Sequence, residues 1–273
     1  MTAPLMDSPS HRLKIVPEPT ADDPPISVLA RGVSVLYCFD SDDRRELTLA
    51  DITRLCRLPK ATVHRLLREL IVLGLVERTD FGYRLGIKLF ELGLRVPRQI
   101  SIREVAFPCV QDLYEATQET VHLAIPDGNE ALYLAKFSPR NAAPVPTSVG
   151  GRMPMYCTAV GKVLLAHADR QLQRSILQGP MPRLTPRTVV AAGLVGRQLE
   201  AVLETGLGYD REEYARGVLC VAAPVFDKSG TAVAAISVSG WATQFDPLRV
   251  GLAVRTAALS MTRALSSHEE DED

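Results

Sequence analysis

Basic and hydroxyl-bearing side chains gather between Asp51 and Glu69 in a pattern that suits contact with nucleic acid. The stretch between these two carboxylates contains five Lys or Arg and no Asp or Glu. Arg and Lys neutralise phosphates and donate to guanine acceptors, while Thr and His are short enough to reach base edges or the DNA backbone. A basic helix face is more often only a solvated surface, so the elements that carry these side chains decide between the two interpretations.

Cysteine, histidine and acidic residues offer two other kinds of chemistry. Cys220 as nucleophile, with His122 as base and Asp210 as orienter, would make the chain a thiol-dependent hydrolase. No motif around Cys220 supplies a nucleophile elbow or an oxyanion hole. The second alternative is a redox-sensing DNA-binding regulator that uses Cys157 and Cys220. The five cysteines include no C-x-x-C pair and no His at ligand spacing, so we expect neither a metal nor a cofactor.

Three helices are predicted around the basic cluster. The apolar spacing indicates a first helix from Ser27 to about Phe39. Thr48 and Asp51 form an N-cap arrangement that starts a short second helix. After a break of three residues, Pro59 suits the first position of a third helix, which Gly74 ends. Two short helices joined by three residues, the second with a basic face, are typical of a helix-turn-helix.

A β-hairpin is predicted directly after the third helix. Residues 75–78 and 83–85 alternate in polarity around an Asp-Phe-Gly turn at 80–82. This hairpin is typical of the wing of a winged helix-turn-helix, and it places Arg78 and Arg84 where they can touch the flanking DNA backbone. Residues 26–96 contain 12 basic and 9 acidic side chains, a net charge of +3, whereas the whole chain has −1. The charge distribution therefore adds weak support for DNA binding.

The remaining sequence predicts an α+β domain with an antiparallel sheet. Two hairpins are indicated, Val121–Ile125 with Ala131–Ala135 and Leu219–Phe226 with Thr231–Ser239. Helical patterns cover five segments: Lys88–Arg95, Ile102–Tyr114, Thr158–Ala168, Arg197–Thr205 and Leu248–Ser266. With 273 residues, of which 46% are hydrophobic, the chain is long enough for two domains with cores of their own.

The predicted boundaries follow from these elements. They are a disordered tail at 1–25, a winged helix-turn-helix at 26–86, a linker helix region at 87–100, a larger domain at 101–267 and an acidic tail at 268–273. The N-terminal tail lacks the apolar core of a signal peptide. No stretch approaches the roughly 18 uncharged apolar residues that cross a bilayer. We therefore expect a cytoplasmic protein that does not interact with membranes.

The quoted motifs resemble the IclR family of bacterial transcriptional regulators. The segment Leu58-Pro59-Lys60-Ala61-Thr62-Val63-His64-Arg65-Leu66-Leu67 matches the family pattern around its third helix, and further matches run through 150–162 and 208–225. The resemblance covers about residues 27–267. One departure is Arg57, where the family usually has a glycine in a tight turn. A left-handed Arg costs roughly 1 kcal/mol, although its side chain is also placed to reach a phosphate.

The resemblance implies a fold and a function. The fold is a winged helix-turn-helix joined by a linker helix to a GAF-like effector-binding domain. The function is transcription regulation by a homodimer, or a dimer of dimers, that binds a pseudo-palindromic double-stranded DNA operator under control of a small organic effector. The predicted DNA contacts are Arg31, Thr48, Lys60, Ala61, Thr62, His64, Arg65, Arg68, Arg78 and Arg84.

An effector pocket is also implied by position within the family pattern. Its residues would be Ala159, Val160, Asp210, Val218, Cys220, Ser237 and Ser239. Backbone N–H groups at a helix start favour an anion, and two hydroxyls at alternate strand positions point to the same side. A small carboxylate, such as an aromatic acid, would suit this set. Asp210 would then anchor a ligand hydroxyl, or, beside an anionic ligand, be protonated itself or bridged to the ligand by water.

Overall fold

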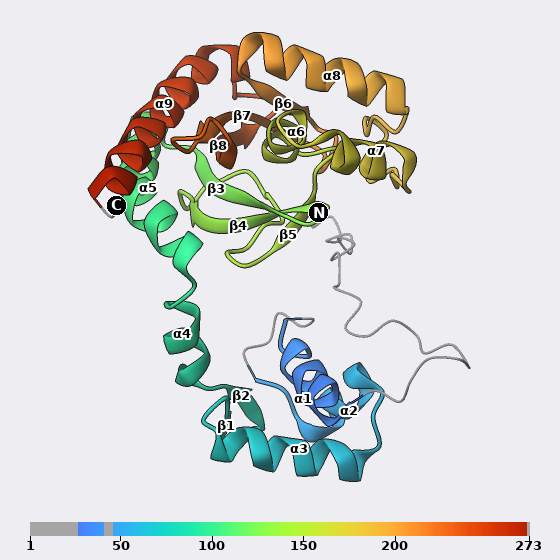
Figure 1. The fold of residues 1–273 in the computed structure, drawn as a ribbon. Helices are drawn as coiled ribbons and strands as arrows, with labels where there is room; N and C mark the ends of the chain where they lie inside the picture. Colours follow the sequence, from blue (N-terminus) through green and yellow to red (C-terminus); the bar gives the residue numbers. More distant parts are fainter. Residues whose placement is uncertain (1–26, 41–45, 272–273) are drawn as a thin grey trace. The chain divides into compact units, whose positions relative to one another are not determined.

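Residues 27–40 and 46–271 are described by a computed structural model (Figure 1). The chain divides after Val96 into an N-terminal unit and a C-terminal unit that begins at Pro97. The tail predicted over residues 1–25 lies outside the described residues, as do the last two residues of the acidic tail.

The N-terminal unit is a small helical domain with a two-stranded hairpin. Its elements are α1 (Val28–Tyr37), α2 (Leu49–Cys56), α3 (Lys60–Val72), β1 (Val76–Arg78), β2 (Tyr83–Leu85) and α4 (Ile87–Gly93). The apolar stripes of α1, α2 and α3 meet in one core around Val35, Ile52, Val63 and Leu67, all fully buried. The predicted winged helix-turn-helix fold is thus present.

Local capping and turn chemistry set the start of α2 and α3. Thr48 and Asp51 form the predicted capping box, in which Thr48 Oγ1 accepts from the Asp51 N–H at 3.2 Å. Arg57 keeps the left-handed conformation, with φ 55°, that this turn favours. Pro59 was expected as the first helical residue but is the N-cap, with ψ 137°, because its backbone is still extended there. The turn geometry thus survives without a glycine.

The wing packs against the start of α2 through backbone hydrogen bonds. β1 pairs antiparallel with β2, and Leu47 forms two backbone hydrogen bonds with Tyr83, each 2.9 Å long. A Cβ on Gly82 would lie 2.4 Å from the carbonyl oxygen of Leu47, so this position requires a glycine. Thr79 Oγ1 accepts from the N–H of Gly82 at 3.0 Å and closes the turn.

The C-terminal unit is built on a six-stranded antiparallel sheet of order β5-β4-β3-β8-β7-β6. The strands are β3 (Thr120–Asp127), β4 (Glu130–Phe137), β5 (Arg152–Pro154), β6 (Gly208–Arg211), β7 (Val218–Phe226) and β8 (Ala232–Trp241). The helices are α5 (Pro97–Thr117), α6 (Ala159–Ala166), α7 (Arg170–Gln178), α8 (Ala192–Thr205) and α9 (Pro247–Asp271). Both predicted hairpins are present, as β3–β4 and β7–β8.

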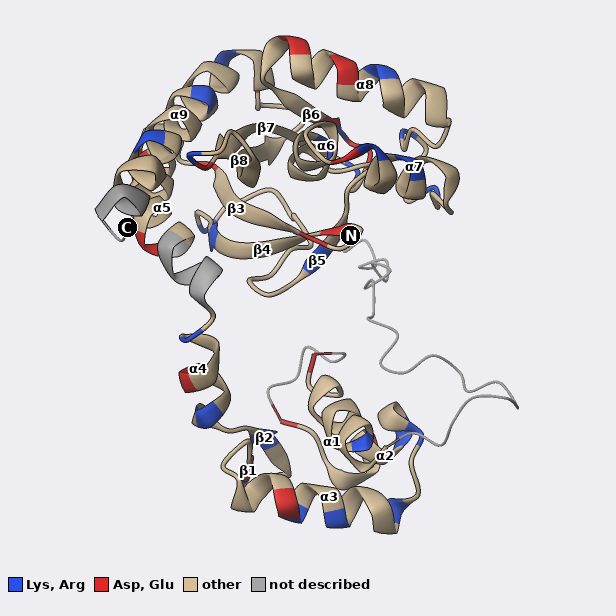
Figure 2. Cartoon of the chain, viewed as in Figure 1, with Lys and Arg blue, Asp and Glu red and all other residues tan. Residues whose placement is uncertain are grey.

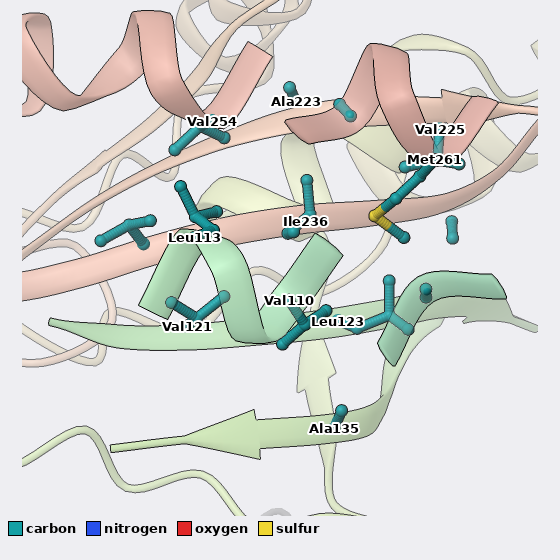
Figure 3. Packing of buried hydrophobic residues seen from close by; sticks show 14 of the residues in the cluster. Val110, Leu113, Val121, Leu123, Ala135, Ala223, Val225, Ile236, Val254 and Met261 are labelled. Carbon is teal, nitrogen blue, oxygen red and sulfur yellow. The ribbon is translucent and has the colours of Figure 1, made fainter. Parts of the chain in front are cut away.

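The two faces of this sheet are covered differently. On one face, α5 and α9 pack side by side onto a core that includes Leu123, Ile236 and Met261 (Figures 1 and 3). On the other face, α6 packs over small residues such as Ala222 and Ala235. Both faces are buried, because helices cover both sides.

Several element predictions were incomplete. The strands β5 and β6 and the helix α7 were not predicted, since the two strands are short and lie at the sheet edges, and α7 is mostly polar. α8 begins at Ala192 rather than Arg197, and α9 runs to Asp271 rather than Ser266. The β3–β4 turn contains only Gly128 and Asn129, because β3 continues through Asp127.

Candidate functional sites

The basic face of α3 is exposed as predicted for a DNA-reading helix. Lys60, Ala61, His64, Arg65 and Arg68 are exposed, and Thr62 is half-buried. Figure 2 shows Lys and Arg along this helix, with one acidic position towards its C-terminal end. The opposite face of α3 supplies the buried leucines and valine of the N-terminal core. The same amphipathic pattern therefore anchors the helix and presents its charges.

Some of the predicted DNA contacts already have partners in the free protein. Arg65 forms an ion pair with Glu69 at 3.3 Å, and Arg84 forms one with Glu77 at 2.7 Å. Exposed ion pairs of this kind contribute about 0–1 kcal/mol, so a DNA phosphate can compete for either arginine. Thr48 is exposed, but its hydroxyl donates to Asp51 at 2.6 Å within the capping box.

The remaining predicted contacts lie on α1 and on the wing. Arg31 is half-buried on α1, and Arg78 is exposed on β1. The tip of the wing exposes the aromatic ring of Phe81, with 82% of its surface accessible. Sequence reasoning treated Phe81 only as a turn residue, because its exposure follows from the fixed turn and not from any periodicity.

A small pocket lies between α6 and the sheet in the C-terminal unit. Its cavity measures about 20 Å³, which holds roughly one water. The lining residues are His122, Tyr133, Val145, Thr147, Thr158, Ala159, Asp210, Tyr214, Ala215, Val218, Cys220 and Ser239. The pocket thus brings together five of the predicted effector residues, namely Ala159, Asp210, Val218, Cys220 and Ser239.

Two predicted effector residues lie outside that lining. Val160 is buried within α6. Ser237 is buried on β8 opposite His122 of β3, and its hydroxyl has no hydrogen-bond partner among the described residues. Asp210, Cys220 and Ser239 instead form one row across β6, β7 and β8. Residues directly opposite one another in an antiparallel sheet share a face, which explains why these three meet at the pocket.

Asp210 is a buried carboxyl group with a perturbed pKa. Burial raises the pKa of Asp210 to about 7, and the opposing attraction of Lys162 and the N–H groups of Glu213 and Tyr214 limits the shift. Asp210 Oδ1 accepts from the Glu213 N–H at 2.7 Å and from the Tyr214 N–H at 3.4 Å. Near neutral pH, this carboxyl group can therefore be either a hydrogen-bond donor or an anion.

A buried ion pair lies beside Asp210. Lys162, 1% exposed, pairs with Glu213 and donates to the carbonyl oxygen of Tyr209 at 2.9 Å. Glu213 Oε2 has no hydrogen-bond partner among the described residues. This pair fixes α6 to the segment that follows β6, so it positions two walls of the pocket relative to one another.

The start of α6 has backbone donors without a partner among the described residues, and its first residue, Ala159, lines the pocket. Thr158 caps the helix, because its Oγ1 accepts from the Gly161 N–H at 3.2 Å and donates to the Pro154 carbonyl oxygen at 2.8 Å. Within the described residues, no hydrogen bond occupies the N–H of Ala159 or Val160. The helix N-terminus can therefore bind an anion.

His122 and Thr147 form a polar wall that sequence reasoning did not assign to the effector pocket. His122 Nε2 lies 2.8 Å from Thr147 Oγ1, and burial together with the charge of Lys136 lowers the pKa of His122 to about 3. Lys136 donates to the carbonyl oxygens of Val145 and Thr147 at 3.2 and 2.7 Å. The alternation of side chains along β3 could have indicated His122, because it lies on the face opposite to Val121 and Leu123. The segment around Thr147 has no regular structure and therefore no periodic pattern that would indicate Thr147.

The geometry argues against both cysteine alternatives. Burial raises the pKa of the Cys220 thiol to about 12 and also raises that of Cys157. Among the described residues, no hydrogen bond joins Cys220 to His122, whose Nε2 is paired with Thr147. A nucleophile or a redox sensor needs an accessible thiolate, which these two positions disfavour.

Two broader features of the described residues can be added. None of their helices is long and apolar enough to cross a membrane. No group of three or more His, Cys, Asp or Glu in this part of the chain is arranged to hold a metal ion.

Comparison with known proteins gives consistent results for both units. Residues 95–266 match the family model for the C-terminal domain of the bacterial transcriptional regulator IclR, and residues 28–80 match that for the IclR helix-turn-helix domain. The HTH-type transcriptional regulator XynR of Escherichia coli is 33% identical over 248 residues, covering 89% of this chain and 98% of the relative. The E. coli repressor AllR is 30% identical over 243 residues, covering 87% and 89%.

A solved structure resembles the chain over most of its length. It is an IclR homologue from Microbacterium hydrocarbonoxydans complexed with 4-hydroxybenzoate. The TM-score is 0.83 at 32% sequence identity, with 88% of this chain and 99% of the other covered.

Proposed function

Because the chain belongs to the IclR family of bacterial transcriptional regulators, we propose that its C-terminal pocket binds a small organic carboxylate that controls operator binding by the N-terminal unit. The proposal rests on two features found together at this pocket. The backbone N–H groups at the start of α6 have no partner among the described residues, and Asp210 is a buried carboxyl group whose pKa lies near neutrality. A protonated Asp210 can donate to the same carboxylate that the helix N-terminus attracts.

The other walls suit the remainder of an aromatic acid. Tyr133, Val145 and Val218 supply ring or aliphatic surface, while Thr147 and Ser239 supply hydroxyls for a phenol. The Microbacterium relative, which is complexed with 4-hydroxybenzoate, makes a hydroxylated aromatic acid a sound first candidate. Cys220 adds a buried, weakly polar contact to this set.

On the DNA side, we place α3 in the major groove and the wing on the flanking backbone. Lys60, His64, Arg65 and Arg68 lie on the exposed face that would meet the DNA. A homodimer, or a dimer of dimers, presents two such helices to a pseudo-palindromic operator, with half-sites set by the spacing of the two helices. Effector binding then shifts the population between two spacings of the DNA-binding units and changes operator affinity.

A mobility shift tests this function directly. The purified chain is tested on the intergenic DNA beside its own gene, with and without a panel of small carboxylates and phenolic acids. We expect a salt-sensitive specific complex that one compound alters. Absence of a specific complex on this DNA and on distant candidate operators would overturn the proposal.

Two substitutions locate the DNA contact. Arg65→Ala should weaken operator binding by about fivefold or more, as expected for a lost base or phosphate contact of about 1–3 kcal/mol. Arg174→Ala, an exposed arginine of the C-terminal unit, is the matched control and should leave affinity unchanged. Equal effects of the two variants at physiological salt would contradict the assignment of α3.

A further inference from the structure

We propose that Cys38 and Cys56 form a peroxide-reactive thiol pair, and that its closure to a disulfide weakens operator binding by distorting the turn before α3. The effect on DNA rests on the proposed function, whereas the disulfide itself does not.

The two cysteines lie at the ends of neighbouring helices. Cys56 is the last residue of α2, and Cys38 follows α1 directly as its C-cap. Cys38 Sγ lies 3.3 Å from the carbonyl oxygen of Ser34 and 3.8 Å from that of Ile52. Ile52 precedes Cys56 by four residues, so its carbonyl is the normal helical acceptor of the Cys56 N–H.

This contact places the Cys38 sulfur against the helical turn that carries Cys56. Cys38 is fully buried, whereas Cys56 is half-buried at the end of its helix. A dissolved oxidant therefore reaches Cys56 before Cys38.

The surroundings of Cys56 favour its thiolate. The hydrogen bond from the Cys38 thiol, helped by backbone N–H groups and opposed by burial, lowers the pKa of Cys56 to about 7. Burial raises the thiol pKa at Cys109, Cys157 and Cys220. Because the thiolate is the reactive species, oxidation should be selective for Cys56.

The chemistry needs hydrogen peroxide as the oxidant. The Cys56 thiolate attacks one peroxide oxygen, forming an S–O bond while the O–O bond breaks and hydroxide leaves, so Cys56 is oxidised to sulfenic acid. The Cys38 sulfur then attacks the Cys56 sulfur, forming the S–S bond while the S–O bond breaks. The second hydroxide leaves and takes the Cys38 proton as water. In total, two thiols and one peroxide give one disulfide and two waters.

The disulfide would act on the DNA-reading helix through a short connection. Only Arg57, Leu58 and Pro59 separate Cys56 from the start of α3, and Arg57 already holds a left-handed backbone. An S–S bond of about 2.05 Å would draw the end of α2 towards the end of α1. The three-residue turn passes this shift to Lys60 and its exposed neighbours.

The test uses the full chain and its operator. The reduced protein is treated with hydrogen peroxide, and the non-reduced peptides are mapped by mass spectrometry while operator affinity is measured. We expect a Cys38–Cys56 peptide pair that has lost two hydrogens and an operator Kd raised at least tenfold. Dithiothreitol should reverse both changes.

Two variants make the outcome specific. Cys56→Ser should abolish the disulfide and the peroxide effect on Kd, and Cys109→Ser, another half-buried thiol, should keep both. If Cys56→Ser does not fold, the peptide map of the unsubstituted protein still decides whether the pair forms.

Either of two results would overturn the proposal: oxidation at Cys109 without a Cys38–Cys56 disulfide, or a complete disulfide with unchanged Kd. Failure of the reduced protein to bind any operator would instead count against the proposed function, since the peptide map does not depend on DNA.

Discussion

The two faces of the six-stranded sheet are built from the same strands but bury different kinds of side chain. On β3, Val121 and Leu123 face α5 and α9, while His122 and Ala124 face α6 and the pocket. The first face contains apolar side chains packed between helices. The second contains buried polar groups, including Ser237 and Glu213, each with an oxygen that has no hydrogen-bond partner in the described part of the chain.

If the pocket binds an effector as proposed, this difference places the polar groups that lower stability on the binding face. An unsatisfied buried polar group costs about 1–3 kcal/mol of stability. The polar groups of the pocket face therefore offset part of the stability that the apolar face contributes. Substitutions on the two faces should therefore have separable effects on stability and on effector affinity.

The largest expected effect comes from the buried ion pair on the pocket face. Lys162→Met leaves the Glu213 carboxylate unpaired in the interior, so the free energy of unfolding should fall by about 3–5 kcal/mol. Urea denaturation measures the change. The double variant with Glu213→Gln should recover most of the loss, and a loss that stays the same in the double variant would show that the ion pair is not its cause.

A substitution on the apolar face should affect stability alone. Ile236→Ala removes a fully buried side chain between β8 and the helices, at a cost of about 2–5 kcal/mol in unfolding free energy. Ile236→Val is the milder control at about 0.5–1.5 kcal/mol. Isothermal titration with the effector should give an unchanged Kd for both variants; a tenfold change would mean that the two faces are not independent.

Asp210 should make effector binding depend on pH. Since the pKa of Asp210 is raised to about 7, the group is protonated below this pH and can donate to a carboxylate, whereas above it the two anions repel. The Kd should rise about tenfold per pH unit above 7. Asp210→Asn should flatten this profile between about pH 6 and 9, and a slope retained in the variant would point to another group.

The raised pKa of Asp210 also makes the stability of the effector-free protein depend on pH. The pKa of Asp210 rises from 3.8 in its ordinary state to about 7 in the folded protein, so the folded state binds this proton more tightly. The stabilisation is complete below pH 3.8 and is lost as the pH rises through 7. Comparing urea midpoints of the unsubstituted protein and Asp210→Asn across this range measures it.

The smallest effect is expected at Ser237. Its hydroxyl is buried and has no hydrogen-bond partner among the described residues, so Ser237→Ala should leave the unfolding free energy unchanged or raise it by up to about 1 kcal/mol. If the hydroxyl contacts the effector, affinity falls while stability does not. A fall in stability of 2 kcal/mol or more would indicate that the hydroxyl has a partner in the folded protein.

Sequence reasoning succeeded where the pattern is periodic and local. The helices α1 to α3, the wing and the two long hairpins repeat apolar residues at helical or strand spacing, and the Thr48–Asp51 box marks a helix start by residue type alone. The positions of Asp210, Cys220 and Ser239 came from family resemblance. Their alignment in one row became visible only through the strand register.

The sequence was uninformative where long-range contacts decide the structure. The edge strand β6 contains Gly208 and Asp210, which are uncommon in strands, and it is stabilised by pairing with β7. Thr147 lies in a segment without regular structure and reaches the pocket because Lys136 binds that segment's carbonyl oxygens. Neither the pairing nor this long-range contact leaves a periodic trace in the sequence.

The cavity beside α6 is only about 20 Å³ in volume, and this size bears on how fast a ligand can bind as well as on which ligand fits. The proposed aromatic acid is far larger than one water. If it binds here, Tyr214 and Ala215, which wall the cavity between β6 and β7, or the segment around Thr147, must move before it enters. Association that waits for such opening has a rate that stops increasing at high ligand concentration. The opening rate would then set how soon transcription responds to a sudden supply of the compound.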